Sequence, residues 1–245
     1  MSDLVEGRNA VAEALSAGLP IERVLIAEGV KPDAAVERVR SLAAEHGVPV
    51  EQCPRRKLDA MSDRGAHQGV AALARPFAYA DLDSVLRLTT GQPRSLIIAL
   101  DHVTDPGNLG AVARSAEAVG AAALVIEERR SAQVTAAAFK ASAGAVAHLP
   151  VARVSNLSRA LARAKDAGYW VAGASEHAEQ DAWASPLEGR IVLVMGAEGE
   201  GLSRLVRENC DFLVRLPVEG HVGSLNVAQA ATVLMYEWVR RGLTP

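Results

Sequence analysis

The 245-residue sequence contains little cysteine, few aromatic residues and no long apolar run. Its two cysteines, Cys53 and Cys210, lie far apart and show no metal-ligand spacing, so neither a disulfide framework nor a zinc site is expected. No segment reaches the run of about 18 apolar residues that a membrane span requires. The N-terminal segment MSDLVEGRNAV carries acids where a secretion signal carries bases. We therefore expect a cytoplasmic protein without a membrane partner.

A surplus of positive charge is also absent, because the formal net charge is −3 at pH 7. If the protein binds nucleic acid, the positive surface must be local, since each phosphate contact needs a nearby lysine or arginine rather than a basic average. Nucleotide-binding motifs are missing as well. There is no G-x-x-x-x-G-K-[ST] segment, and GAEGEG at residues 196–201 departs from G-x-G-x-x-G and follows a late strand. These absences argue against P-loop and Rossmann dinucleotide enzymes.

What is present is a repeated alternation of helical and strand patterns. Residues 1–75 predict a small α/β unit, and residues 76–94, which hold prolines and a glycine around one weak helix, predict a linker. From residue 95 onward, strands that are apolar throughout alternate with helices, as in a parallel sheet covered on both faces. We therefore expect an α/β protein with domains at residues 1–75 and 95–245.

Three glycine-rich loops follow strands of the second domain: DHVTDPGNLG, GAEGEGLS and EGHVGSLN. Ligands of open α/β sheets lie beyond the carboxyl ends of the strands, which makes these loops candidates for a binding site. Helix capping is the alternative. Asp105 and Asn108 in the first loop, and Ser224 and Asn226 in the third, are residue types that accept hydrogen bonds from free N–H groups. Glu198 suits a helix N-terminus for its charge. The amount of glycine favours a site, because capping alone does not need it.

The second domain contains, in order, DPGNLGAVARSAEAVGA, VLVMGAEGEGLS and LPVEGHVGSLNVAQAATVLMYE. Together these segments resemble the three motifs of the SpoU (TrmH-type) RNA 2′-O-ribose methyltransferases, and the resemblance covers residues 95–245. At the front, VEGRNAVAEAL and HQGVAA resemble the substrate-binding domain of the members that methylate a guanosine of large-subunit (23S) rRNA. The resemblance implies a SPOUT-type catalytic domain with a trefoil knot, which is a rare exception to unknotted connections. It also implies a homodimer and S-adenosylmethionine as the methyl donor.

The resemblance also implies a set of site residues and no metal. The catalytic residues would be Asn108, Arg114, Glu198, Ser224 and Asn226, and the cofactor-binding residues would be Gly196, Leu216 and Leu225. A guanidinium is a poor base because its pKa lies above about 12. We therefore expect Arg114 to bind the phosphate beside the target and to favour the developing alkoxide, the alternative being a solvated helix arginine. The other polar residues would hold Arg114 and the ribose, and Glu198 is a candidate to pair with Arg114.

Candidates for RNA contact lie mainly in the first domain. They are Arg8, Asn9, Arg55, Arg56, Lys57, Arg64, His67 and Gln68, with Lys140 in the second domain. The run at 55–57 also suits a solvated turn. Acidic and basic residues are nearly balanced over residues 1–75, so an RNA-binding face must be patterned. Since only 4% of residues are aromatic, recognition of RNA by shape and backbone is expected rather than extensive base stacking.

Three hypotheses on function follow from these patterns. The first is 2′-O-methylation of a guanosine in 23S rRNA. The second is a related 2′-O-methyltransferase that acts on tRNA or on another rRNA nucleotide, although the additional front domain disfavours the short tRNA-type enzymes. The third is a non-catalytic RNA-binding or ribosome-assembly protein, against which the complete set of polar site residues argues.

Overall fold

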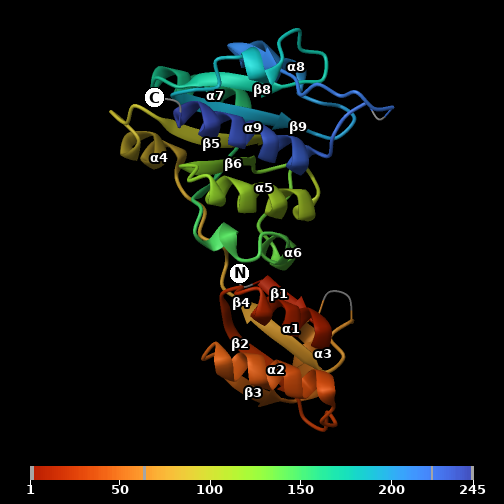
Figure 1. Ribbon diagram of the computed structural model, residues 1–245. Helices are drawn as coiled ribbons and strands as arrows, with labels where there is room; N and C mark the ends of the chain where they lie inside the picture. Colours follow the sequence, from red (N-terminus) through yellow and green to blue (C-terminus); the bar gives the residue numbers. More distant parts are fainter. Residues whose placement is uncertain (1–2, 63–64, 222, 244–245) are drawn as a thin grey trace. The chain divides into compact units, whose positions relative to one another are not determined.

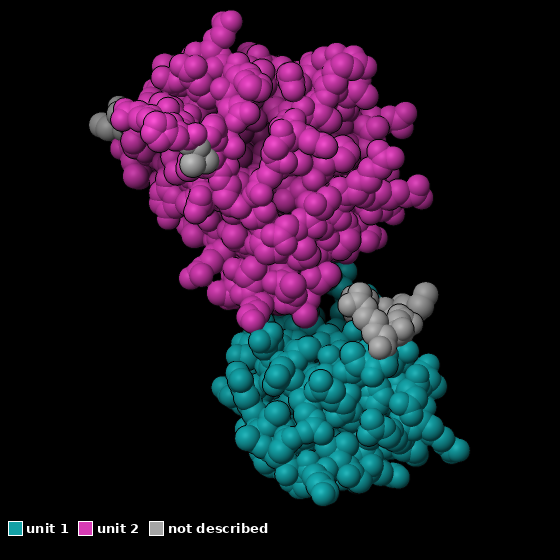
Figure 2. Space-filling model, turned by 90° about the vertical axis from the view of Figure 1, so that its right-hand side faces the viewer, with its two compact units in different colours: residues 1–78 teal, residues 79–245 magenta. Residues whose placement is uncertain are grey.

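The computed structural model describes residues 3–62, 65–221 and 223–243 of the chain. Two compact units are present, Met1–Ala78 and Tyr79–Pro245, which Figure 2 distinguishes by colour. The first boundary lies close to the residue 75 that the sequence predicts. Each unit has its own sheet and its own buried core.

The first unit is built on a four-stranded sheet in the order β1-β4-β2-β3 (Figure 1). Strand β4 runs antiparallel to both β1 and β2, whereas β2 and β3 are parallel. Leu58 of α3 packs on one sheet face with Leu25 and Leu73. The elements are β1 (Asp3–Glu6), α1 (Arg8–Ser16), β2 (Ile21–Ala27), α2 (Ala34–Glu45), β3 (Val50–Cys53), α3 (Arg55–Met61) and β4 (Val70–Ala74).

The second unit is built on a six-stranded sheet in the order β10-β8-β9-β5-β6-β7, and every strand pair is parallel. Its strands are β5 (Ser95–Asp101), β6 (Ala123–Glu127), β7 (Val151–Val154), β8 (Trp170–Ala174), β9 (Arg190–Gly196) and β10 (Phe212–Val214). All seven residues of β5 are buried, as apolar strands between two helical layers require. The expected α/β fold with a parallel second-domain sheet is confirmed.

Helices cover both faces of this sheet. They are α4 (Leu82–Leu88), α5 (Pro106–Ala118), α6 (Ala136–Ala141), α7 (Leu157–Asp166), α8 (Arg204–Asn209) and α9 (Val227–Gly242). Helices α5 and α9 lie side by side (Figure 1), and the hydroxyls of Ser115 and Thr232 join them at 2.7 Å. Helix α6 packs against α5 at Gly110, where a Cβ atom would lie 2.5 Å from the carbonyl oxygen of Ala138. Glycine therefore permits the close approach of these two helices.

The segment 76–94 departs from the linker that the sequence predicts. Residues 79–94 belong to the second unit, because α4 places Leu82, Val85 and Leu86 in the core of that unit. Asp81 caps the helix by accepting a hydrogen bond from the Ser84 amide at 3.0 Å. The proline and glycine residues thus flank a packed helix rather than a free connection.

Within the described residues, the chain has no helix with the length and apolar character that crossing a membrane demands.

Candidate functional site

The carboxyl ends of neighbouring strands bring the glycine-rich loops to one edge of the second sheet. Asp101, the last residue of β5, lies opposite Gly196, the last residue of β9. The loops that lead to α5 and α8 therefore start side by side. The third loop, which precedes α9, reaches the same place through side-chain hydrogen bonds.

Three polar side chains, one from each loop, form a cluster that we call the amide–carboxylate cluster: Asn108, Glu198 and Asn226. Asn108 Nδ2 donates to Glu198 Oε1 at 3.1 Å. Asn226 Nδ2 donates to the same oxygen at 2.6 Å and to Asn108 Oδ1 at 2.9 Å. Since these residues are separated by 28 to 118 positions in the sequence, their bonds fix the three loops relative to one another.

Helix capping and site formation turn out to be compatible. Asp105, not Asn108, caps α5 through bonds from the amides of Gly107 and Asn108 at 3.2 and 3.1 Å. Asn226 caps α9, because its Oδ1 accepts from the Ala228 amide at 2.9 Å. This bond also assigns the orientation of the Asn226 amide, which leaves Nδ2 directed at Glu198. The cap geometry therefore aims the side chain into the cluster.

A cavity of about 470 Å³ adjoins this cluster. Its lining contains five of the predicted site residues: Gly196, Glu198, Leu216, Ser224 and Leu225. Glu198 thus belongs both to the cluster and to the cavity wall. Ligand-binding cavities of proteins commonly occupy roughly 300–1,000 Å³, so this one is large enough for a small-molecule ligand.

Two features of the lining affect how a ligand can bind: a tight turn at the end of β9 and exposed apolar side chains. Residues 197–201 fold back on the end of β9, with the Gly201 amide bonded to the Ala197 carbonyl at 2.9 Å, and a Cβ atom on Gly196 would clash with the backbone of Gly201. Leu225 and Val218 line the cavity and remain 45% and 44% exposed. Their apolar surface is open to a ligand.

The sequence did not indicate one part of the lining, the segment after β8. Ser175, Glu176 and His177 line the cavity beside the predicted loops. Strand β8 lies between β10 and β9, so its carboxyl end necessarily meets theirs. The small residues GAS at the carboxyl end of β8 are the sequence feature that could have indicated this part of the cavity. The wall carries charges of both signs, because Glu176, Glu198 and Glu200 line it together with Arg207 and Arg215.

Arg114 stands apart from the cluster. It lies on α5 six residues after Asn108 and is exposed. Its guanidinium makes no hydrogen bond or ion pair with any residue in the described parts of the chain. The expected pair between Glu198 and Arg114 is therefore absent, because Glu198 instead accepts hydrogen bonds from the two asparagines.

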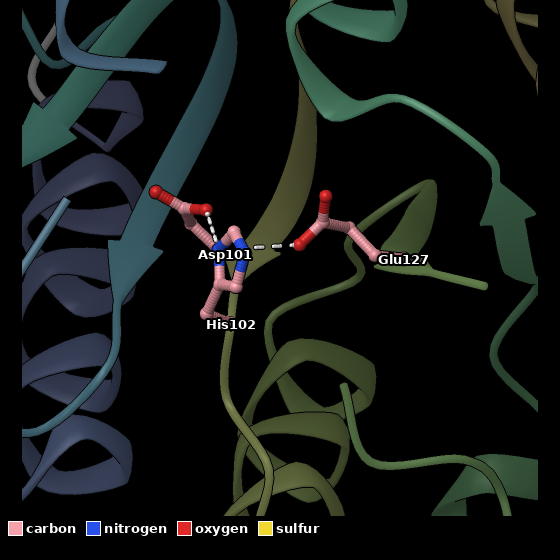
Figure 3. A group of neighbouring side chains, drawn as sticks. All are labelled: Asp101, His102 and Glu127. Atoms are coloured by element: carbon pink, nitrogen blue, oxygen red, sulfur yellow. Dashed lines mark hydrogen bonds and ion pairs between the residues drawn. The ribbon is translucent and has the colours of Figure 1, made fainter. Parts of the chain in front are cut away.

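A second polar cluster lies at the same sheet edge and contains Asp101, His102 and Glu127 (Figure 3). His102 Nδ1 donates to Asp101 Oδ1 at 2.6 Å and lies 3.4 Å from Glu127 Oε2. The other oxygen of the buried Asp101 carboxylate accepts from the Ser203 amide at 2.6 Å. The hydrogen bond that His102 donates to Asp101 raises the pKa of His102, and burial raises the pKa of Glu127. This cluster therefore ties β5, β6 and the start of α8 together.

The same three side chains are close enough to offer one ligand atom each to a metal ion. The Asp101–His102 distance of 2.6 Å is that of a charge-assisted hydrogen bond, so this pair shares a proton at the nitrogen that a metal would need. The arrangement fits a proton better than a metal ion.

The RNA-contact candidates of the first unit fall into two groups. Asn9, Gln68 and the run at 55–57, which opens α3, are exposed. Arg8 is half-buried: Nε donates to the Gln68 carbonyl at 3.1 Å, and Nη1 pairs with Asp33. Arg64 lies outside the described residues. In the second unit, Lys140 is exposed on α6.

His67 is a correction to the predicted RNA surface. Its side chain is only 3% exposed. Nε2 donates to Asp59 Oδ1 at 2.9 Å, and Nδ1 accepts from the Gly69 amide at 3.0 Å. Both ring nitrogens are thus used to hold the turn before β4, and the ring is not presented to a ligand. The sequence HQG could not reveal this, because the partner Asp59 comes from α3.

Comparison with known proteins agrees with the motifs. Residues 95–236 match the family described as the SpoU rRNA methylase family, and residues 4–80 match a domain described as RNA 2′-O ribose methyltransferase substrate binding. A Staphylococcus aureus (strain MSSA476) protein assigned to the TrmH family of tRNA/rRNA methyltransferases is 40% identical over 239 residues, which cover 97% of this chain and 96% of that protein.

Two solved structures extend the likeness to three dimensions. The SpoU methyltransferase AviRb from Streptomyces viridochromogenes, in complex with the cofactor AdoMet, is 28% identical with a TM-score of 0.70 and covers 99% of this chain and 91% of its own. An AdoMet-bound rRNA methyltransferase from Sinorhizobium meliloti is 27% identical with a TM-score of 0.65, covering 100% of this chain and 88% of its own. The chain belongs to the SpoU methylase family and is an RNA methyltransferase.

Proposed function

We propose that the protein transfers a methyl group from S-adenosylmethionine to the ribose 2′-oxygen of a guanosine in large-subunit (23S) rRNA. The observation that carries this proposal is the amide–carboxylate cluster beside the cavity. Asn108, Glu198 and Asn226 come from three loops, and Glu198 is shared with the cavity wall. A preorganised polar group next to a cofactor-sized cavity is what alignment of a hydroxyl with a methyl donor requires.

The cavity fits S-adenosylmethionine in size, polarity and charge. Leu216, Leu225 and Val218 offer apolar surface for the adenosine part. Glu176 and Glu200 on one side, and Arg207 and Arg215 on the other, give the lining charges of both signs. These suit a cofactor that carries a sulfonium, an ammonium group and a carboxylate. When bound, S-adenosylmethionine supplies a methyl group on a positively charged sulfur atom, which makes that methyl open to attack by an oxygen nucleophile.

The chain's own residues then have to orient the ribose and accommodate the negative charge that develops as the 2′-hydroxyl loses its proton. Glu198 Oε1 is occupied by two amide donors, whereas Oε2 has no hydrogen-bond partner among the described residues. Oε2 is therefore the acceptor that the cluster offers to the substrate. Arg114, with a guanidinium free of protein partners in that same part of the chain, supplies positive charge for the adjacent phosphate and the developing alkoxide.

The RNA class is the finer part of the proposal. The match to the family described as SpoU rRNA methylases and a likeness to a solved rRNA methyltransferase over the whole chain support rRNA. The S. aureus relative is described with both tRNA and rRNA, which keeps tRNA or another rRNA nucleotide as the second candidate. A non-catalytic RNA-binding role is disfavoured by the intact cluster. In the first unit, Asn9, Gln68 and the run at 55–57 are the proposed RNA contacts.

A methyl-transfer assay with labelled S-adenosylmethionine tests this function. Purified protein is incubated with protein-free large-subunit rRNA or with bulk tRNA, each taken from cells that lack the modification. We expect label in the rRNA and none in the tRNA. Label confined to tRNA would establish the second candidate, and the absence of label from every RNA would overturn the proposal.

A homodimer and a trefoil knot in the second unit are part of the same proposal, as is a cytoplasmic location. In support of the dimer, α9 leaves the apolar side chains of Val233 and Tyr236 exposed. A second copy of the chain that packs on this helix would cover them.

A further inference from the structure

The loop between β6 and α6 is held firmly although it carries no regular structure. The Ala132 amide donates to the Val103 carbonyl at 2.8 Å, and the Ser131 hydroxyl donates to the same oxygen at 3.3 Å. Gln133 Nε2 donates to the Glu127 carbonyl at 2.9 Å. At its start, the Glu128 amide donates to the Val154 carbonyl of β7 at 2.8 Å. These bonds fix the loop to the strand ends on both sides.

The tip of this loop presents two arginines, Arg129 and Arg130. Both are exposed, and Arg130 has the left-handed backbone angle φ of 58° that non-glycine residues seldom adopt. Within the described ranges, neither guanidinium forms a hydrogen bond or an ion pair. By contrast, the exposed Arg87 and Arg163 pair with Asp81 and Asp83.

The loop stands at the same sheet edge as the proposed active site. Strand β6 is the neighbour of β5. The loop donates hydrogen bonds to the carbonyl of Val103, which lies two residues before Asp105. Asp105 in turn caps α5 and accepts a hydrogen bond from the Asn108 amide. The arginines and the amide–carboxylate cluster are therefore presented by directly connected loops.

The charges around the arginines leave them available to an anion. The buried Asp101 and the partly buried Glu127 face His102 (Figure 3). Arg130 is close enough to influence the pKa of both His102 and Glu127. The remaining neighbouring acid, Glu128, is exposed and forms no ion pair with a described residue. Two unpaired guanidiniums on a fixed base suit phosphate oxygens, which they bind through two parallel N–H donors.

We propose that Arg129 and Arg130 bind phosphates of the RNA strand beside the target nucleotide. The inference rests on the proposed function for the identity of the ligand. In this role the loop positions the RNA on the catalytic unit, in addition to the contacts of the first unit. The arginines act in substrate binding rather than in methyl transfer itself.

The test compares the double variant R129A/R130A with a matched control, R87A/R163A. The control also removes two exposed arginines from the catalytic unit, but from the ends of α4 and α7 that lead into the opposite sheet edge. Initial rates of methylation of protein-free large-subunit rRNA are measured against RNA concentration and potassium chloride concentration. Filter retention of the same RNA is measured in parallel, and calorimetry of S-adenosylmethionine binding checks that the cavity is intact.

For R129A/R130A we expect KM for RNA to rise roughly tenfold while kcat changes by less than about twofold. The slope of log affinity against log salt should become shallower by about 1.4, which corresponds to two lost phosphate contacts on a single strand. The control should retain wild-type values. Wild-type KM and salt slope in R129A/R130A, or equal changes in the control, would overturn the inference.

The outcome also separates this inference from the proposed function. If the wild type binds rRNA without methylating any RNA, the proposed function fails, whereas filter retention of the variants still decides the role of the arginines. If the wild type neither binds nor methylates RNA, both fail. If it methylates RNA and R129A/R130A behaves like the wild type, only the inference fails.

Discussion

At the residue scale, Asn226 uses the two ends of its side-chain amide for two tasks, one in the fold and one in the proposed active site. Its Oδ1 caps α9, and its Nδ2 binds Glu198 and Asn108. Substitution by aspartate keeps an oxygen for the cap and removes the donor. It also places a second carboxylate against Glu198 Oε1, to which the present distance is 2.6 Å.

Asn226→Asp should lower the thermal midpoint only slightly, because the cap is kept and the two facing carboxylates are both exposed. It should lower kcat about 100-fold or more, since a lost preorganised donor costs roughly that much. The matched control is Asn156→Asp. Asn156 caps α7 in the same way, because its Oδ1 accepts a hydrogen bond from the Arg159 amide at 2.8 Å, and it lies in no proposed site. Thermal unfolding and steady-state kinetics measure both effects. An Asn226→Asp variant with wild-type kcat would remove the cluster from the mechanism.

Arg114 allows a second residue-scale prediction. Because its guanidinium forms no hydrogen bond or ion pair with a described residue and does not line the cavity, Arg114→Ala should keep wild-type affinity for S-adenosylmethionine. Turnover should fall about 100-fold, since the positive charge beside the phosphate and alkoxide is lost. Calorimetry and initial rates measure the two quantities, with Glu117→Ala on the same exposed part of α5 as the control. Unchanged turnover would make Arg114 a solvated helix residue.

His102 gives a pH-dependent prediction. Its hydrogen bond to Asp101 raises its pKa, with Glu127 adding to the rise and burial and Arg130 opposing it. A histidine with a raised folded pKa contributes stability that is complete below its unfolded pKa of about 6.5 and disappears as pH rises through the folded pKa. His102→Asn removes the ring while tolerating the left-handed backbone at φ 57°.

Thermal unfolding of wild type and His102→Asn should consequently differ more at about pH 6 than at about pH 9. The wild type should be the more stable protein at the lower pH, where the imidazolium faces both carboxylates. A difference in midpoint that stays constant or grows with rising pH would contradict the proposed ion pairing.

At the element scale, the contact between α5 and α6 depends on one missing side chain. A Cβ atom on the buried Gly110 would lie 2.5 Å from the carbonyl oxygen of the buried Ala138 and 2.6 Å from Ala141 Cβ. Gly110→Ala should therefore destabilise the second unit by about 1–3 kcal/mol, as overpacking does. Chemical denaturation followed by circular dichroism measures this. Gly220→Ala, where a Cβ would meet nothing within 4 Å, is the control. Equal stability of the two variants would show that α6 shifts freely.

The sequence predicts the elements well where periodicity and motif agree. The central residues of strands β5 and β9 are apolar, and the loops that follow these strands carry the family motifs. The sequence therefore predicts both the parallel sheet and the meeting of its loops. Helix α4 falls where the sequence predicts a weak helix, but it packs in the core of the second unit instead of lying in a linker. Its short apolar pattern does not indicate this packing. The burial of His67 and the contribution of the loop after β8 depend on tertiary neighbours, which single-sequence patterns do not contain.

At the scale of the whole molecule, the proposed homodimer predicts a surface-specific effect. Tyr236 is 53% exposed on α9, and a buried charge at a subunit contact is costly. Tyr236→Glu should shift sedimentation velocity from dimer to monomer. Leu88→Glu, which changes an exposed leucine on α4 outside the proposed contact, should leave the wild-type sedimentation coefficient. A wild type that sediments as a monomer would contradict the dimer.

The proposed activity is methyl transfer to one ribose hydroxyl of rRNA, and the position of the new methyl group decides whether the protein has this activity. Protein-free large-subunit rRNA is incubated with the protein and S-adenosylmethionine, digested with nucleases and analysed by mass spectrometry. We expect a single new 2′-O-methylguanosine that is lost with Asn226→Asp. A methyl group on a base atom, or no methylated nucleotide at all, would contradict it.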